Sequence, residues 1–134
     1  MSTRGSAAPD PAGVVQRWLD EVWMGGNLDV VDELVAPRYV RHGPSGTVVR
    51  DREGLRDDLR QYFRVLHKPV ITVDDQAVAG DRVWTRMTIE GVDLEAGSTR
   101  VMSWLQVFRI DDEGRLAESW LLHAVSIDWR GGAG

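Results

Sequence analysis

The side chains that could move a proton near neutral pH are few in this chain, which has only three histidines. His42 follows "RYVR" and precedes the turn "GPSG", and His123 lies in "ESWLLHAV", which also holds Glu118. An imidazole titrates at about pH 6.5, so it can accept or donate a proton at working pH. A glutamate among apolar side chains is tuned towards neutral pH unless an arginine or backbone donors keep it ionised. These residues predict acid–base chemistry, with His42, Glu118 and His123 as candidate catalytic residues.

Other kinds of chemistry find little support in the sequence. There is no cysteine, and the three histidines are dispersed, so neither a thiolate zinc site nor another metal site is expected. The sequence has no phosphate-binding glycine loop and no nucleophile elbow. We therefore expect a protein without a cofactor.

Charge and hydropathy exclude two classes of partner. The formal net charge is −5 with acidic and basic residues mixed throughout, whereas a nucleic-acid surface needs clustered positive charge. No apolar run reaches the roughly 18 residues of a membrane span, and "MSTRGSAAPDPAG" lacks the apolar core of a signal peptide. The sequence predicts a soluble cytoplasmic protein that binds neither nucleic acid nor membrane.

Three helices must come early in the chain. Asp10 can cap the first, which ends at Gly25; Asn27 can cap a short second one, ended by Pro37; and Asp51 opens the third. "RYVRHGPSG" reads as a strand running into a turn, and the chain beyond the third helix keeps a period of two, which predicts four consecutive antiparallel strands. We expect one domain over residues 10–130, with flexible termini over 1–9 and 131–134.

A resemblance to a known family rests on several segments in order. They are the first helix through "WMGGNLDVVDELVAPRYVRHGP", then "REGLRDDLRQYF", "VDDQAVAGDRVWTRMTIEG" and "VFRIDDEGRLAESW". Together they span about residues 12–128 and resemble the nuclear transport factor 2-like superfamily, within it the SnoaL-like polyketide cyclase group.

The resemblance implies an α+β fold: a cone-shaped, half-open barrel in which a strongly curved, mostly antiparallel sheet wraps around three helices and leaves an apolar pocket. Members are commonly dimers through the outer sheet face. The superfamily uses the pocket for aldol cyclisation, isomerisation, epoxide opening, dehydration and hydroxylation, or only for binding, so the fold alone does not define the reaction.

Alternation along the strands sorts side chains into inward and outward sets. If Phe108 packs inward, Met102, Trp104 and Gln106 share its side; Gln106 is then either a donor to a substrate carbonyl or a core amide bonded to backbone. Trp84 faces outward, which suits a dimer interface.

In the last strand, Leu116 should be buried, which turns Glu118 and Trp120 inward. The SnoaL-like pattern has a glutamate, a tryptophan two residues later, and an acidic residue about four further on, but this chain has Ala124 there. Either His123 reaches the pocket through a β-bulge, or it faces outward and the acid–base group is lost or moved. Glu118 has a second interpretation too, as a structural carboxylate bonded to an arginine or a helix end.

His42 is placed by the resemblance at the pocket mouth, where it is either a base or a loop histidine bonded to its own turn. Aromatic and amide side chains would form the walls. The candidate substrate-binding residues are Trp18, Tyr39, Tyr62, Met102, Trp104, Gln106 and Trp120.

The sequence thus favours a cofactor-independent cyclase or isomerase of bacterial secondary metabolism, including antibiotic biosynthesis, that acts on an apolar or polycyclic polyketide-like substrate. An epoxide hydrolase or hydroxylase of the same fold is a related hypothesis. The hypothesis from another class is a non-catalytic binding or accessory protein, which the alanine at position 124 supports.

Overall fold

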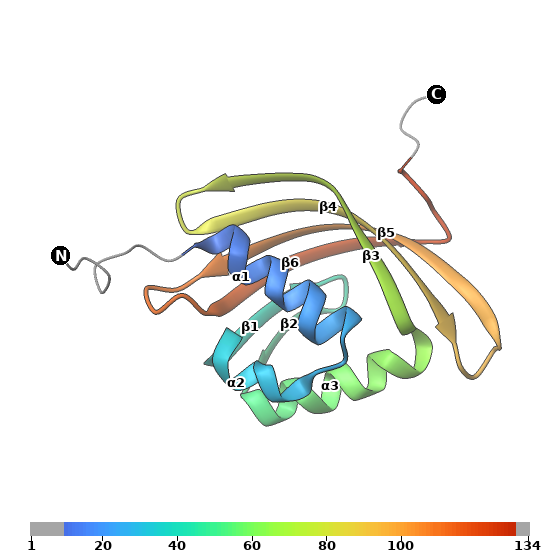
Figure 1. Ribbon diagram of the computed structural model, residues 1–134, viewed down its shortest axis with the longest axis horizontal. Coiled ribbons are helices and arrows are strands. Elements are labelled where there is room, and N and C mark those ends of the chain that lie inside the picture. Colours follow the sequence, from blue (N-terminus) through green and yellow to red (C-terminus); the bar gives the residue numbers. More distant parts are fainter. Residues whose placement is uncertain (1–9, 131–134) are drawn as a thin grey trace.

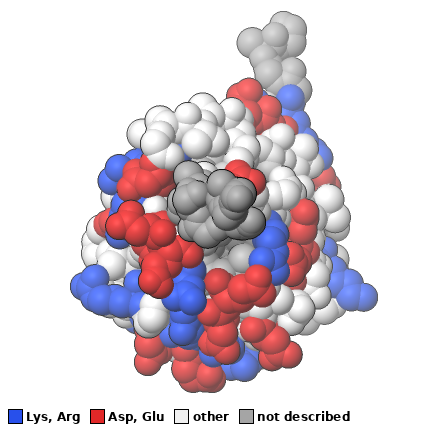
Figure 2. All heavy atoms as spheres, turned by 60° about the vertical axis from the view of Figure 1, so that its left-hand side comes forward, with Lys and Arg blue, Asp and Glu red and all other residues white. Residues whose placement is uncertain are grey.

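A computed structural model describes residues 10–130. The predicted flexibility of residues 1–9 and 131–134 concerns segments outside the described residues. Acidic and basic side chains are intermingled over the face seen in Figure 2, as the mixed charges of the sequence lead one to expect.

Three helical segments form where the capping residues predict them. Asp10 accepts a hydrogen bond from the Gly13 amide, Asn27 from the Asp29 amide, and Asp51 from the Gly54 amide. None of the helices within residues 10–130 combines the length and the apolar character that crossing a membrane requires. The helical bounds are α1 Pro11–Arg17 continuing as the π-helix η2 Trp18–Met24, the 3-10 helix η3 Leu28–Val30 continuing as α2 Val31–Leu34, and α3 Arg52–Val65.

The second half of the first helix is a π-helix, which its sequence pattern did not predict. A π-helix has a wider turn than an α-helix, so residues five apart come close to one face. Trp18 and Trp23 are five apart, and both are buried. The wider turn therefore directs two tryptophans towards the sheet.

Within residues 10–130, six strands form one sheet in the order β2-β1-β6-β5-β4-β3. All neighbours are antiparallel except β1 and β6, which are parallel. The sequence predicts five of these strands; the short β2 occupies what it predicts as a turn and loop. The bounds are β1 Val35–Gly43, β2 Gly46–Arg50, β3 His67–Ala79, β4 Arg82–Asp93, β5 Ser98–Ile110 and β6 Leu116–Val125.

The sheet arches over the helices and does not close on itself (Figure 1). Its concave face carries Val83, Met87, Ile89 and Phe108, all fully buried under the helices. The predicted α+β architecture, a curved and mostly antiparallel open sheet around three helices, is confirmed.

A β-bulge in β6 decides which side chains face inward. Arg109 of β5 pairs with Glu118, whereas the next residue, Ile110, pairs with Leu116, so Ala117 is an extra residue in β6. A bulge of this kind shifts the alternation by one position. Leu116 is buried as predicted, but from Glu118 onward every side chain lies on the face opposite to the one that simple alternation from Leu116 predicts.

Candidate active site

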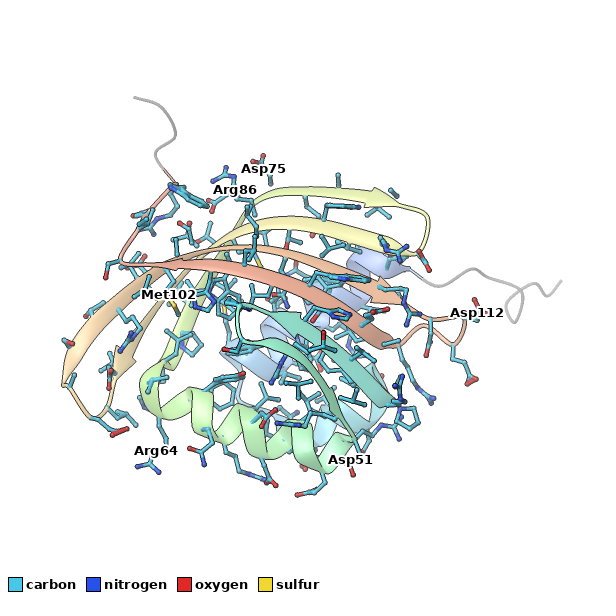
Figure 3. All side chains as sticks on the ribbon, turned by 180° about the vertical axis from the view of Figure 1, so that it is seen from behind. Asp51, Arg64, Asp75, Arg86, Met102 and Asp112 are labelled. Atoms are coloured by element: carbon cyan, nitrogen blue, oxygen red, sulfur yellow. The ribbon has the colours of Figure 1, made fainter. Side chains whose placement is uncertain are left out.

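A cavity of about 470 Å³ lies between the concave face of the sheet and the helical segments η2 and α3. Such a volume is in the range of small-molecule sites. Met102 occupies the space between the sheet and α3, whereas Arg86 and Asp75 project from the opposite, outer face (Figure 3). The two faces of the sheet are therefore distinct environments.

Seven of the predicted site residues line this cavity. The inward placement of Met102, Trp104 and Gln106 on β5 follows the predicted alternation with Phe108. The seven residues are Trp18, Tyr39, Tyr62, Met102, Trp104, Gln106 and His123.

His123 reaches the cavity because of the bulge at Ala117, one of the two alternatives that the sequence leaves open. It lies opposite Trp104 of β5 and is exposed at the edge of the cavity. Within residues 10–130 its imidazole makes no side-chain hydrogen bond to protein groups. Both ring nitrogens are thus available to a ligand.

Glu118 and Trp120 do not face the cavity, so the prediction that they turn inward is wrong. The same bulge that brings His123 in turns these two side chains out. Trp120 lines a shallow hollow on the outer face together with Trp84 and Leu122. Ala124 also shares the outer face, so a carboxylate at that position would not reach the cavity of this chain.

His42 lies on the outer face as well, which corrects its expected place at the pocket mouth. Tyr39 and Arg41 of β1 point into the cavity, so alternation turns His42 away. Its Nε2 is 2.7 Å from Glu118 Oε2, its Nδ1 is 2.8 Å from Thr47 Oγ1, and its ring stacks on Trp120 with centroids 5.3 Å apart. Both ring nitrogens are engaged, one by Thr47 of the neighbouring strand β2 and the other by Glu118 of β6, so His42 is a strand histidine and not the loop histidine of the structural alternative.

Glu118 is an ionised structural carboxylate. The His42 hydrogen bond, and next the Arg109 Nε donor 3.0 Å from Oε1, hold its pKa below the ordinary value against the opposing effect of burial. Glu118 therefore follows the second interpretation, a structural carboxylate bonded to an arginine, because its hydrogen-bond partners lower its pKa more than desolvation raises it.

Gln106 is buried, with 7% of its surface exposed, and lies two residues after Trp104 along β5. Its backbone carbonyl accepts a hydrogen bond from Thr85, whereas its side-chain amide makes none within residues 10–130. The amide is therefore a free donor in an apolar wall, and the backbone-satisfied alternative does not apply to it.

Tyr39 contributes a buried hydroxyl that already has a partner. Its Oη is 2.6 Å from Ser119 Oγ, and burial raises the pKa of the phenol above its ordinary value. Because the hydroxyl stays neutral and bonded, Tyr39 shapes the wall without acting as a base.

The lining residues that the sequence prediction does not include comprise the aromatic and basic side chains of Trp23, Arg41 and Arg100. Trp23 packs edge-to-face on Trp104 with centroids 5.5 Å apart, a contact that depends on the π-helix. The signal for the two arginines is alternation, because each lies two residues from a predicted wall residue, Tyr39 or Met102.

Comparison with known proteins gives a family match and several structural neighbours. The family model described as SnoaL-like domain matches residues 15–119. No curated protein matches the chain.

Three solved structures illustrate the likeness. Wild-type IdmH from Streptomyces antibioticus, described as a candidate polyketide cyclase, is 27% identical with a TM-score of 0.72, covering 85% of this chain and 91% of that one. A candidate polyketide cyclase from Acidithiobacillus ferrooxidans is 21% identical with a TM-score of 0.77, covering 92% and 91%. SalBIII, described as an epoxide hydrolase/cyclase-like enzyme with a role in pyran ring formation in the polyether salinomycin, is 16% identical with a TM-score of 0.73, covering 85% and 90%. The last two likenesses concern the fold alone.

Proposed function

Because this chain belongs to the SnoaL-like domain family, we propose that it is a cofactor-independent cyclase or isomerase acting on an apolar polyketide-like molecule in bacterial secondary metabolism. The fold and the candidate cyclases among its structural neighbours support a cyclase-type role. The proposal goes further by assigning the acid–base step to particular residues.

One observation carries the proposal: His123 presents an unengaged imidazole to an apolar cavity that also holds the free amide of Gln106. The two residues lie on adjacent strands, displaced by two residues along them, which is roughly 7 Å. That separation leaves room for a carbonyl group and its neighbouring carbon between the two side chains.

The step follows from this arrangement. His123 removes a proton from the carbon next to a carbonyl, the C–H electron pair becomes the C=C bond of an enolate, and the Gln106 amide donates to the enolate oxygen. The enolate carbon then attacks a second carbonyl of the same molecule, closing a ring, or is reprotonated elsewhere, giving an isomer. The imidazolium of His123 returns the proton, so no co-reactant is consumed.

Deuterium exchange tests the step without knowledge of the natural substrate. We expect the protein to accelerate exchange at the carbon next to the carbonyl of 2-tetralone in D2O, followed by NMR, and we expect His123→Asn to abolish the acceleration. His42→Asn is the matched control, since it removes the outer-face histidine and leaves the cavity intact. Equal exchange by both variants would refute a base role for His123.

A second candidate function is binding without chemistry. The composition of the cavity wall favours it. Among residues 10–130, no aspartate or glutamate lines the cavity, so no carboxylate of the wall can orient His123. The same experiment separates the two: saturable binding of 2-tetralone with no accelerated exchange would support the binding protein.

We also propose that two copies pair through the outer face of the sheet. Trp84, Leu105 and Leu122 expose 52%, 44% and 65% of their surface there, around the hollow that includes Trp120. Clustered exposed apolar side chains of this kind mark interaction surfaces.

A further inference from the structure

The charge of the cavity wall is opposite to that of the chain. The sequence has an excess of acidic residues, 21 against 16 basic ones. Yet the ionisable side chains with a charged or chargeable nitrogen that line the cavity are Arg41, Arg100 and His123, and no carboxylate lines it within residues 10–130. An apolar cavity with only basic groups in its wall favours a ligand with negative charge.

Arg100 forms an ion pair with a single carboxylate, that of Asp93. Its Nη2 donates to Asp93 Oδ2, and the other oxygen of Asp93 accepts from two backbone amides of the adjoining turn. This pair is one cation to one anion, so its net charge is close to zero, and the buried Nε of Arg100 has no hydrogen-bond partner within residues 10–130.

Arg41, by contrast, shares its carboxylate partner with a second arginine. Its Nη2 lies 3.0 Å from Asp58 Oδ2, and the same oxygen lies 2.9 Å from Arg50 Nε. Two guanidinium groups share one carboxylate, so the cluster has a net positive charge. Of Arg41 and Arg50, which share Asp58, Arg41 lines the cavity and Arg50 does not.

The guanidinium of Arg41 is also held in position. It stacks 5.5 Å from the ring centre of Tyr62, and its side chain is 18% exposed. Its Asp58 contact is its one hydrogen bond within residues 10–130. The remaining N–H groups of a fixed, partly buried guanidinium are therefore free to bind a carboxylate, for which the planar fork is well suited.

We infer that Arg41 binds a carboxylate of the ligand, so that the substrate class is an apolar carboxylic acid. The inference rests on the proposed use of the cavity. Arg41 pairs with Ser119 of β6, four residues before His123, which is roughly 14 Å along the strand. An acid bound at Arg41 thus leaves its reacting carbon several bonds away, towards His123.

A matched pair of probes tests this: 2-anthracenecarboxylate and its methyl ester, titrated against the full-length protein at pH 7 by calorimetry. The two differ in charge and hardly in their apolar surface. We expect the acid to bind roughly tenfold more tightly than the ester, because a hydrogen-bonded charge pair contributes on that scale.

Three variants then locate the preference. Arg41→Gln should weaken binding of the acid roughly tenfold and change binding of the ester by less than about twofold. Arg60→Gln is the control, since it removes an exposed arginine that pairs with Glu53 and Asp57 and lines no part of the cavity; it should keep the preference for the acid. Arg41→Lys should keep part of it, because a lysine retains the charge without the fork.

The inference is overturned if the parent protein shows no preference for the acid, including no measurable binding of it, or if the two glutamine variants lose the preference equally. Thermal unfolding of each variant shows whether it is folded. Exchange of the neutral 2-tetralone needs no Arg41, so the failure of the acid–base proposal and the failure of this inference are separate outcomes.

Discussion

The two faces of the sheet, around strands β1, β6 and β5, carry similar chemical groups in different surroundings. On the outer face, both ring nitrogens of His42 and both oxygens of Glu118 have partners, and the Trp120 ring contacts both the His42 ring and the guanidinium of Arg82. On the inner face, within residues 10–130, the His123 imidazole and the Gln106 amide have no side-chain partner and adjoin a cavity.

The comparison teaches that residue type alone does not identify a site. By residue type, His42 and Glu118 on the outer face form the more complete acid–base pair. Their hydrogen-bonding capacity is used within the protein, however, so they stabilise the fold. The inner groups have unused hydrogen-bonding capacity, and a buried polar group without a partner, such as the Gln106 amide, favours a ligand that supplies one.

The largest expected effect concerns the two histidines. His123→Asn should lower the rate of 2-tetralone exchange by about 10²-fold or more, the usual scale of a general base, whereas His42→Asn should change it by less than about twofold. NMR in D2O measures both. A large loss with His42→Asn and none with His123→Asn would reverse the assignment of the two faces.

The next effect concerns the apolar part of the outer face. If two copies pair there, Leu122→Arg should raise the dimer dissociation constant by roughly tenfold to a hundredfold, because it places an unpaired charge in the interface. Sedimentation velocity over a concentration series measures this. Leu94→Arg alters another exposed leucine, 53% against 65% for Leu122, on the turn between β4 and β5 and should have no effect. A parent protein that is monomeric at every concentration contradicts the proposed pairing.

A stability effect should distinguish Glu118 from a cavity group. Glu118→Gln should lower the free energy of unfolding by about 1–3 kcal/mol at pH 7, because it removes a charged partner from both His42 and Arg109. Urea unfolding measures the change, and Glu113→Gln, an exposed glutamate in the turn before β6, is the control with an expected change under about 0.5 kcal/mol.

The same variant has a pH signature. The folded pKa of Glu118 lies below its ordinary value of 4.5, so its contribution is complete above that pH and is lost as the pH falls through the folded pKa, since the unfolded chain binds the proton first. The difference in unfolding free energy between parent and Glu118→Gln should shrink below about pH 4.5. A difference that grows on acidification would contradict the lowered pKa.

The smallest effect concerns the buried pair on the inner side. Tyr39→Phe should cost about 1 kcal/mol of stability, because the Ser119 hydroxyl loses its partner. Adding Ser119→Ala should recover part of the loss, since no hydroxyl is then left unpaired. Additive losses in this double-mutant cycle would show that the two hydroxyls do not interact.

Local signals determined much of this protein. Asp10, Asn27 and Asp51 predict where the helices begin because a capping side chain acts within a few residues, and alternation around Phe108 predicts that Met102, Trp104 and Gln106 face inward. The order of these segments is enough to indicate the SnoaL-like family.

The tertiary structure decided the features that depend on residues far apart in the sequence, namely strand register and the direction of each side chain. The strand β6 pairs with both β5 and β1, and the single extra residue Ala117 turns Glu118 and Trp120 outward and His123 inward. The partners of Glu118, His42 and Arg109, come from two other strands, so no local pattern could distinguish an arginine-held carboxylate from a catalytic one. The sequence by itself determined the elements and their order; strand register, which a single residue can shift, decided which side chains meet the cavity.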